Sequence, residues 1–239
     1  MKFKAGIIGK GFIGPAHAEA LARIGNAQVV AIAGSDEQAT AKKARSLGID
    51  KSYGDWRKLI HDEEVQVVHI CSPNSLHHEM AKEALNAGKH VVCEKPLTVS
   101  VDQAEELVAL ADKTGRVNTV HFNIRYYPLM QHLKELVCHG ELGQIFAVHG
   151  SYLQDWLHLP SDYNWRLEQG QSGKSRAVAD IGSHWLDLVE FVTGMRISEV
   201  NADFQTFHKT RKKPRQSMEA YAGKLLKSDD TEEVPIDTE

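Results

Sequence analysis

The stretch GIIGKGFIG, residues 6–14, constrains this chain more than any other part of its sequence. Its first three residues belong to an apolar run over residues 3–8 that is typical of a buried parallel strand. Residues 15–24 follow it, and their apolar positions recur at helical spacing. In a strand–turn–helix, the three glycines of G-x-G-x-x-G permit the tight turn, the approach of a pyrophosphate and the close packing of helix on strand. The helix N-terminus then faces the anion. The residues predicted at this dinucleotide cradle are Gly9, Gly11, Phe12, Ile13 and Gly14.

Strand-like and helix-like segments alternate up to about residue 122. Further buried strands are predicted at residues 28–33, 65–71, 90–93 and 117–122, and helices at residues 36–47, 76–87 and 100–114. This alternation is typical of an α/β fold in which helices cover both faces of a parallel sheet. We therefore expect a doubly wound Rossmann domain over residues 1–122.

The pattern changes after residue 122. Helices are predicted at residues 126–138 and 180–193, and partly alternating segments at 144–154 and 200–207 are typical of strands with one covered face. The basic segment 208–215 and the acidic end 227–239 are interpreted as solvated loops. Residues 123–239 are therefore predicted to form a second, α+β domain with a mostly antiparallel sheet.

Composition argues against several kinds of partner and location. The 28 basic and 32 acidic residues give a formal net charge of −4, which offers no electrostatic attraction to nucleic acid or an anionic membrane. The N-terminus lacks the apolar core of a signal peptide, and no apolar run is long enough to span a bilayer. Cys71, Cys93 and Cys138 are widely spaced, as expected of reduced thiols in or near the core. We expect a cytoplasmic protein.

The end of the second strand bears on the choice of cofactor. A dinucleotide site commonly has an acidic residue about 20 positions after the glycines, where it binds the ribose hydroxyls. Asp36 could reach the ribose, or it could cap the following helix. Gly34 and Ser35 would leave space for a 2′-phosphate, so the sequence is compatible with NAD or NADP.

Polar residues follow three further strands of the first domain. They are Ser72 and Asn74 after the third predicted strand, Glu94 and Lys95 after the next, and Asn123 and Arg125 after the last. Because ligands bind beyond the carboxyl ends of parallel strands, these residues should share the cofactor rim. Lys95, placed beside Pro96, could hold a hydroxyl or ketone oxygen and bias proton transfer, although a lysine there could equally be a surface residue.

The second group of candidate residues lies in DIGSHWLD, residues 180–187. On a helix, Asp180 and His184 would share one face, so that the carboxylate could orient a histidine acting as a base, with Asp187 one turn beyond. A helix-capping aspartate and a core histidine are the structural alternatives. Gly182 costs helix stability, which suggests that another group approaches closely there.

Taken together, these motifs resemble the Gfo/Idh/MocA oxidoreductases, relatives of glucose–fructose oxidoreductase and inositol dehydrogenase. The resemblance runs from about residue 3 to 207 and is carried by GKGFIG, by SPN followed by His77, by EKP at 94–96 and by DIGSHWLD. It implies that Lys95 holds the reacting hydroxyl, that Asp180 and His184 manage its proton, and that Asn74, His77 and Glu94 lie near the nicotinamide and its ribose. It also implies a substrate wall of aromatic and polar residues. With the rim residues above, the expected substrate residues are Asn123, Arg125, Tyr152, Trp156, Trp165 and Arg166.

The expected function is NAD(P)-dependent hydride transfer at a hydroxyl or keto carbon of a sugar, cyclitol or related polyol. Metal is not expected, because no cluster of ligand residues has metal-binding spacing. Members of the family commonly exceed 300 residues, so this chain looks C-terminally truncated, and an incomplete second sheet would expose an edge that a homo-oligomer could cover. The alternative is a catalytically inactive NAD(P)-binding sensor or partner subunit.

Overall fold

The structure, a computed structural model, describes residues 2–215 and 230–236. The chain divides into two compact units, Met1–His121 and Phe122–Glu239, which we call unit 1 and unit 2. The division falls one residue before the boundary predicted from the sequence. Each unit is considered by itself below.

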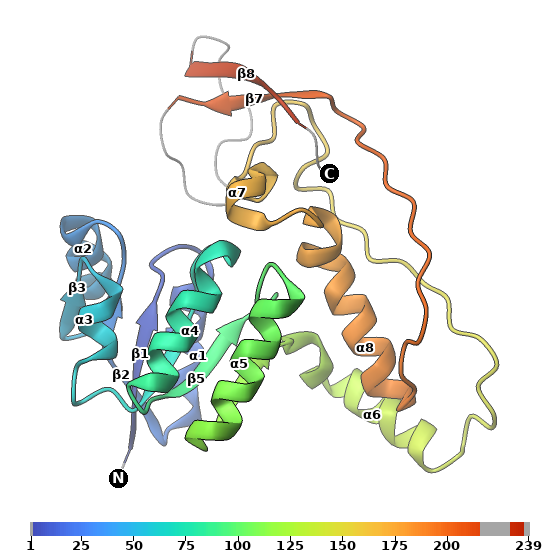
Figure 1. Ribbon diagram of the computed structural model, residues 1–239, viewed down its shortest axis with the longest axis horizontal. Helices are drawn as coiled ribbons and strands as arrows, with labels where there is room; N and C mark the ends of the chain where they lie inside the picture. Colours follow the sequence, from blue (N-terminus) through green and yellow to red (C-terminus); the bar gives the residue numbers. More distant parts are fainter. Residues whose placement is uncertain (1, 216–229, 237–239) are drawn as a thin grey trace. The chain divides into compact units, whose positions relative to one another are not determined.

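Unit 1 contains a six-stranded parallel sheet (Figure 1). Its strands are β1 (Phe3–Ile8), β2 (Ala27–Ala33), β3 (Lys51–Tyr53), β4 (Val67–Ile70), β5 (His90–Glu94) and β6 (Asn118–His121). The spatial order is β3-β2-β1-β4-β5-β6, so successive strands first extend the sheet to one side of β1 and then to the other. The resulting switch point lies between β1 and β4, where ligands of such sheets bind.

Helices cover both faces of this sheet, which confirms the predicted α/β class. They are α1 (Ile13–Ile24), α2 (Glu37–Leu47), α3 (Trp56–Ile60), α4 (His77–Asn86) and α5 (Val101–Thr114). Ile7 of β1 belongs to the apolar cluster formed with α1 and α2, whereas Ile8 belongs to the larger cluster formed with α3, α4 and α5. Adjacent strand residues point to opposite faces, so a continuous apolar run is what a doubly covered strand requires.

Two short elements of unit 1, β3 and α3, were not predicted from the sequence. β3 has only three residues, Lys51–Tyr53, and no apolar run, and α3 has only five, Trp56–Ile60. Helix α1 begins at Ile13, two residues before the predicted start, so Gly14 lies in its first turn. Cys71 and Cys93 are buried free thiols, but Cys138 is exposed, which corrects its expected position in or near the core.

Unit 2 is mostly helical where it has regular structure. Its elements are η2 (Asn123–Tyr126), α6 (Pro128–Cys138), η3 (Trp165–Leu167), α7 (Gln169–Ser172), the π-helical turn η4 (Val178–Gly182), α8 (Ser183–Thr193), β7 (Thr210–Pro214) and β8 (Thr231–Pro235). β7 and β8 form a two-stranded antiparallel sheet. The expected α+β character is present, but the strands are not the predicted ones.

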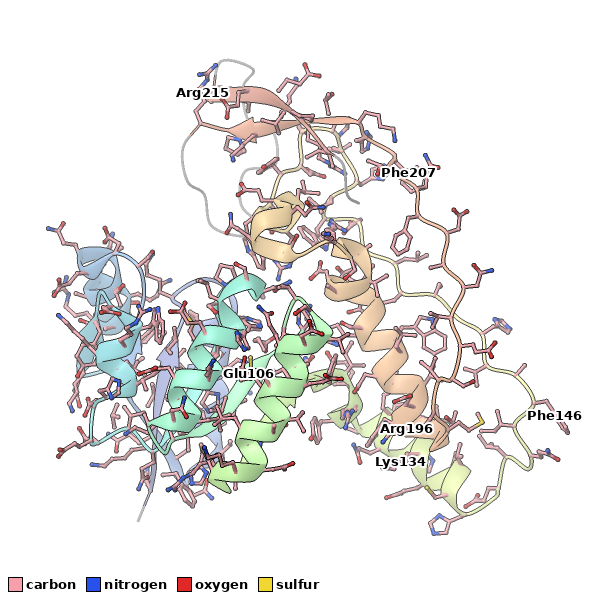
Figure 2. All side chains as sticks on the ribbon, viewed as in Figure 1. Glu106, Lys134, Phe146, Arg196, Phe207 and Arg215 are labelled. Carbon is pink, nitrogen blue, oxygen red and sulfur yellow. The ribbon has the colours of Figure 1, made fainter. Side chains whose placement is uncertain are left out.

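The segments 144–154 and 200–207 are extended in Figure 1 but belong to no strand. Their apolar side chains stand open: Phe146 is 87% exposed, Val200 79% and Phe207 80%. Figure 2 labels Phe146 and Phe207 on these two segments. The strand prediction was wrong because alternation supplies only the side-chain pattern, whereas a strand also needs a hydrogen-bonded neighbour, and the described residues provide none.

The basic segment 208–215 is likewise not a simple solvated loop, because most of it forms β7. Arg211 is only 3% exposed, and its guanidinium donates to the carbonyl oxygens of Leu157, Leu159 and Asp162 at 2.8–3.1 Å. Within the acidic end, the described residues 230–236 include β8 rather than loop alone. None of the described helices is long and apolar enough to cross a membrane.

Candidate functional site

The glycine cradle lies at the switch point of the unit 1 sheet, and each glycine has its own steric reason. Gly9 has φ +120°, and a Cβ there would lie 2.3 Å from the carbonyl oxygen of Cys71. A Cβ on Gly14 would lie 1.9 Å from the carbonyl oxygen of Gly9. A Cβ on Gly11, in contrast, would meet nothing within 4 Å. The backbone at Gly11 is therefore open to an incoming group, as a pyrophosphate requires.

Helix α1 begins beside this opening. Its N-cap residue, Phe12, makes no side-chain capping hydrogen bond, and the first turn from Ile13 contains no acidic residue. Amide groups and the positive end of the helix dipole at such a terminus favour a bound phosphate. The predicted cradle residues thus lie together around one helix N-terminus.

Asp36 acts as the cap of α2, one of its two predicted roles. Its Oδ1 accepts a hydrogen bond from the backbone N–H of Ala39 at 2.6 Å. Asp36 and Ser35 are both exposed beyond the carboxyl end of β2. Contact between either residue and a cofactor ribose remains a prediction.

The loop after β4 is tied to the loop after β5 through His77. The ring nitrogens of this histidine lie 2.9 Å from the carbonyl oxygen of Ser72 and 2.7 Å from that of Pro96. Its side chain is 0% exposed, and burial lowers its pKa, against the opposing effect of the two carbonyl groups. His77 therefore ties the two loops together. Its expected place near the nicotinamide and its ribose remains a prediction. Asn74 is also buried, in the 3₁₀ turn η1 (Asn74–Leu76).

Glu94 ends β5 and Lys95 follows it, at the same edge of the sheet as the cradle. Lys95 is partly exposed, and its peptide bond to Pro96 is cis. Glu94 Oε1 accepts from His17 Nε2 at 3.0 Å and from His121 Nδ1 at 2.6 Å. Burial would raise the pKa of Glu94, but hydrogen bonds from the two histidines outweigh it and lower the pKa to about 2. Glu94 is therefore an anion at neutral pH.

A further histidine completes this group on the side away from Glu94. His69 Nδ1 lies 2.9 Å from His17 Nδ1, and burial lowers the pKa of His69 to about 3. His17, Glu94 and His121 also place one potential metal-ligand atom each within 4.8 Å of one another. The sequence analysis found no cluster with metal-binding spacing, and the folded chain brings these three residues together from separate elements. Sequence spacing gave no signal, because the three residues come from α1, β5 and β6.

In unit 2, His184 lies at the start of α8 with a 9% exposed side chain. The ring of Phe122 meets it edge-on, with 5.9 Å between centroids, and Tyr152 lies tilted against it at 6.0 Å. This aromatic packing fixes the plane of the imidazole. It also accounts for part of the burial expected of a core histidine.

Asp180 lies in the π-helical turn that precedes α8, a feature that is frequent at functional sites. Its Oδ1 accepts from Arg166 Nε at 2.8 Å, so Arg166 is a direct partner of the predicted orienting carboxylate. The guanidinium of Arg166 also lies over the rings of Trp165 and Trp156, at 4.6 and 5.6 Å from their centroids. The structure thus gathers three predicted substrate residues around Asp180 within unit 2.

The structure also shows the surroundings of Arg125, Asn123 and Gly182. Arg125 pairs with Asp187 through both ends of its guanidinium, with Nε 2.9 Å from Oδ2, and this pair holds η2 to α8. Arg125 thus has a structural partner in unit 2, and Asn123 is exposed beside it. The expected place of both as substrate residues remains a prediction. A Cβ on Gly182 would make only ordinary contacts at 3.5 Å or more, so the described residues of unit 2 include no close neighbour there. The direct pairing of Asp180 with His184 remains a prediction.

Comparison with known proteins adds an independent observation. Residues 3–122 match the model of an oxidoreductase family with an NAD-binding Rossmann fold, and residues 130–233 match the GFO/IDH/MocA C-terminal domain. Levoglucosan dehydrogenase of Pseudarthrobacter phenanthrenivorans is 35% identical, over 98% of this chain and 61% of its own length. Myo-inositol 2-dehydrogenase of Thermotoga maritima is 31% identical, over 84% of this chain and 58% of its own length.

Solved structures are similar to this chain as well. Apo levoglucosan dehydrogenase superposes with a TM-score of 0.90 at 32% identity, covering 100% of this chain and 62% of its own. The complex of levoglucosan dehydrogenase with NADH and levoglucosan has a TM-score of 0.85 at 34% identity, covering 88% and 59%. This chain therefore spans about three fifths of the length of these relatives.

Proposed function

The chain belongs to the Gfo/Idh/MocA oxidoreductase family, and on this premise we propose that it transfers hydride between NAD(P) and a hydroxyl or keto carbon of a sugar, cyclitol or related polyol. The observation that carries the proposal is the open backbone at Gly11, at the switch point of the sheet, on the same edge as Lys95. An open cradle suits the pyrophosphate, and a cationic donor on the same edge suits a substrate oxygen.

The proposed chemistry divides the proton and the hydride between protein and cofactor. In oxidation, Lys95 holds the substrate oxygen, and His184 accepts the hydroxyl proton as the carbinol carbon gives up hydride to the nicotinamide. Asp180 orients the imidazole and favours its protonated form. Packing of His184 against Phe122 and Tyr152 supports this assignment, because a base must be held in a fixed plane to be effective.

The proposed substrate class rests on the residues around Asp180. Trp156 and Trp165 provide aromatic faces on which sugar rings can stack, and Arg166 provides fixed donors for hydroxyl oxygens. Levoglucosan and myo-inositol, the compounds in the names of two relatives, are both polyhydroxylated rings. The NADH in a related complex and the family description favour NAD as the cofactor.

A spectrophotometric screen at about 340 nm over cyclitols, anhydrosugars and keto-sugars tests the proposal, with Lys95→Ala and His184→Ala as the decisive variants. Each is expected to lower turnover by at least about 100-fold, the lower range for a general acid–base group, while NADH binding persists. Lys82→Ala and His61→Ala are matched controls, because both side chains are exposed in ion pairs away from the cradle. Unchanged turnover in both decisive variants would remove these residues from the mechanism.

The second candidate is a cofactor-binding protein without catalysis, which the open cradle at Gly11 would serve equally well. It would bind NAD(P)H as a sensor or as the partner subunit of an active enzyme. Fluorescence titration of NADH, followed by turnover assays on the same preparation, separates the two. Tight binding without turnover of any polyol tested would favour the sensor.

We also propose that unit 2 assembles with a second copy of the chain through segments 144–154 and 200–207. Their exposed apolar side chains, which include Phe146, Leu153 and Phe207 at 80% exposure or more, form a surface that is costly to leave in water. Light scattering of the wild type and of the Phe146→Lys/Phe207→Lys variant tests this, and a monomeric wild type would contradict it. The free thiols at Cys71, Cys93 and Cys138 support a reducing compartment, and we propose the cytoplasm.

A further inference from the structure

The histidine cluster of unit 1 has the composition of a metal site. His17 comes from α1, Glu94 from the carboxyl end of β5 and His121 from the carboxyl end of β6. One donor atom from each lies within 4.8 Å of the other two. Two imidazoles and a carboxylate are a donor set that Zn²⁺ accepts in proteins, whereas Ca²⁺ and Mg²⁺ require oxygen ligands.

The geometry needs only a small adjustment to bind an ion. His17 Nε2 and His121 Nδ1 both face Glu94 Oε1, at 3.0 and 2.6 Å. Tetrahedral bonds of about 2.0–2.2 Å place ligand atoms about 3.3 Å apart. Both contacts therefore have to lengthen by less than an ångström, and the two histidine nitrogens, which lie within 4.8 Å of each other, have to reach the same spacing. His121 is the most exposed of the three, with 34% of its side chain accessible, so a fourth ligand from solvent can enter on its side.

A second observation points to the same ligand. A metal-binding histidine usually donates its other ring N–H to a fixed acceptor, which sets the tautomer. His69 occupies that place for His17, with 2.9 Å between the two Nδ1 atoms, and it is itself buried. With its proton on Nε2, His69 offers Nδ1 as the acceptor for this hydrogen bond. On coordination, the proton on His17 Nε2 moves to Nδ1, and the proton on His69 Nδ1 moves to its Nε2, so that His17 donates to His69. The proton on His121 Nδ1 moves to Nε2.

We propose that His17, Glu94 and His121 bind a divalent transition-metal ion of the Zn²⁺ class, with His69 as the outer partner of His17. The ion would join α1 to β5 and β6 beside the dinucleotide cradle. Its role is to hold these elements together, and no step of the proposed hydride transfer is assigned to it. The site is thus independent of whether the chain is an active dehydrogenase.

Calorimetric titration of the tag-free, chelator-treated full chain with ZnCl₂ tests the proposal. One equivalent is expected to bind to the wild type, and binding should be lost in His17→Asn and in His121→Asn. His69→Ala should weaken binding by about 10–100-fold, the usual effect of losing an outer partner. A crystal soaked in Zn²⁺ should show one anomalous peak among the three side chains.

Two control variants remove other candidate ligands. His61→Ala removes an exposed histidine that pairs with Glu83 at 2.8 Å but is in no ligand cluster among the described residues, and Cys138→Ser removes the exposed thiol. Both should bind Zn²⁺ as the wild type does. Circular dichroism checks the fold of each histidine variant, and Glu94→Gln, which keeps the shape of the side chain, takes the place of any variant that is unfolded.

The proposal is overturned if the wild type binds no stoichiometric Zn²⁺. It is also overturned if folded His17→Asn and His121→Asn, or folded Glu94→Gln, bind as tightly as the wild type. In either case the four residues form a hydrogen-bonded cluster only.

Discussion

Replacing Gly9 by alanine should destabilise the fold itself, quite apart from any effect on cofactor binding. The residue has φ +120°, where a side chain is strained, and its Cβ would lie 2.3 Å from the carbonyl oxygen of Cys71. That carbonyl cannot easily retreat, because it belongs to the segment directly after β4, where the N–H of Cys71 donates to Ile8 at 2.7 Å. The clash is therefore with backbone at the junction of β1 and β4.

The expected loss follows from two contributions. Backbone strain at such a position costs about 1–3 kcal/mol, and overpacking of a close-packed contact about 1–3 kcal/mol. Gly9→Ala should thus lower the free energy of unfolding by about 2–6 kcal/mol, out of the roughly 5–15 kcal/mol typical of a folded protein. At about 2–4 °C per kcal/mol for a chain of this size, the melting temperature should fall by roughly 5–20 °C.

Gly11→Ala is the matched control, because a Cβ there meets nothing within 4 Å. It should change stability by no more than about 0.5 kcal/mol. Its methyl group would nevertheless occupy the approach of the pyrophosphate, so NADH affinity should fall at least about tenfold, or about 1.4 kcal/mol. Scanning calorimetry and fluorescence titration of both variants measure the two effects separately. Equal melting temperatures for Gly9→Ala and the wild type would refute the steric reasoning.

Three further predictions concern other parts of the chain. Arg211→Met should lower the free energy of unfolding by about 1.5–3 kcal/mol in urea titrations, because the carbonyl oxygens of Leu157, Leu159 and Asp162 lose their charged donor. Lys212→Met, at an exposed neighbour, should change it by under about 0.5 kcal/mol, and equal losses in the two variants would refute this. Burial raises the pKa of Asp62, but hydrogen bonds from Lys51, the Glu64 amide and Tyr53 outweigh it, so the pKa is lowered. The contribution of this carboxylate to stability is therefore complete above its unfolded pKa of about 3.9 and is lost as pH falls through the folded pKa. Asp62→Asn should flatten the acid-side decline of the free energy of unfolding in urea titrations from pH 7 to 2, and an unchanged slope would count against this reasoning. Asp36→Asn should leave the melting temperature unchanged, because asparagine caps helices as well as aspartate does. It should shift cofactor preference from NAD toward NADP in initial-rate or binding assays, and an unchanged preference would exclude the ribose contact.

Local features of unit 1 were predictable because their causes lie within a few residues. The apolar runs of β1, β2 and β4 mark strands buried on both faces, and Asp36 caps α2 with its own side chain. The glycines of the cradle act through their own backbone freedom and that of the adjoining turn. The missed elements, β3 and α3, are too short to show a period.

The candidate site residues could be proposed from the sequence, but their partners could not. Lys95, Asp180 and His184 were proposed from their motifs, whereas Arg166 as the partner of Asp180 needed the fold of unit 2. Arg125 was proposed as a substrate residue because it follows β6, and its pairing with Asp187 of α8 needed the fold as well. Side-chain pairing between distant segments leaves no periodic trace in a sequence.

The sequence alone determined the class of the fold and the position of its cradle, because hydrophobic periodicity and glycine geometry are local properties of the chain. Only the tertiary structure decided what depends on residues far apart in the sequence. It buried Arg211 in a segment that looks solvated, it left 144–154 and 200–207 outside any sheet among the described residues, and it brought His17, Glu94 and His121 within 4.8 Å. A parallel sheet aligns the ends of strands that are distant along the chain, so the chemistry at that edge exists only once the chain has folded.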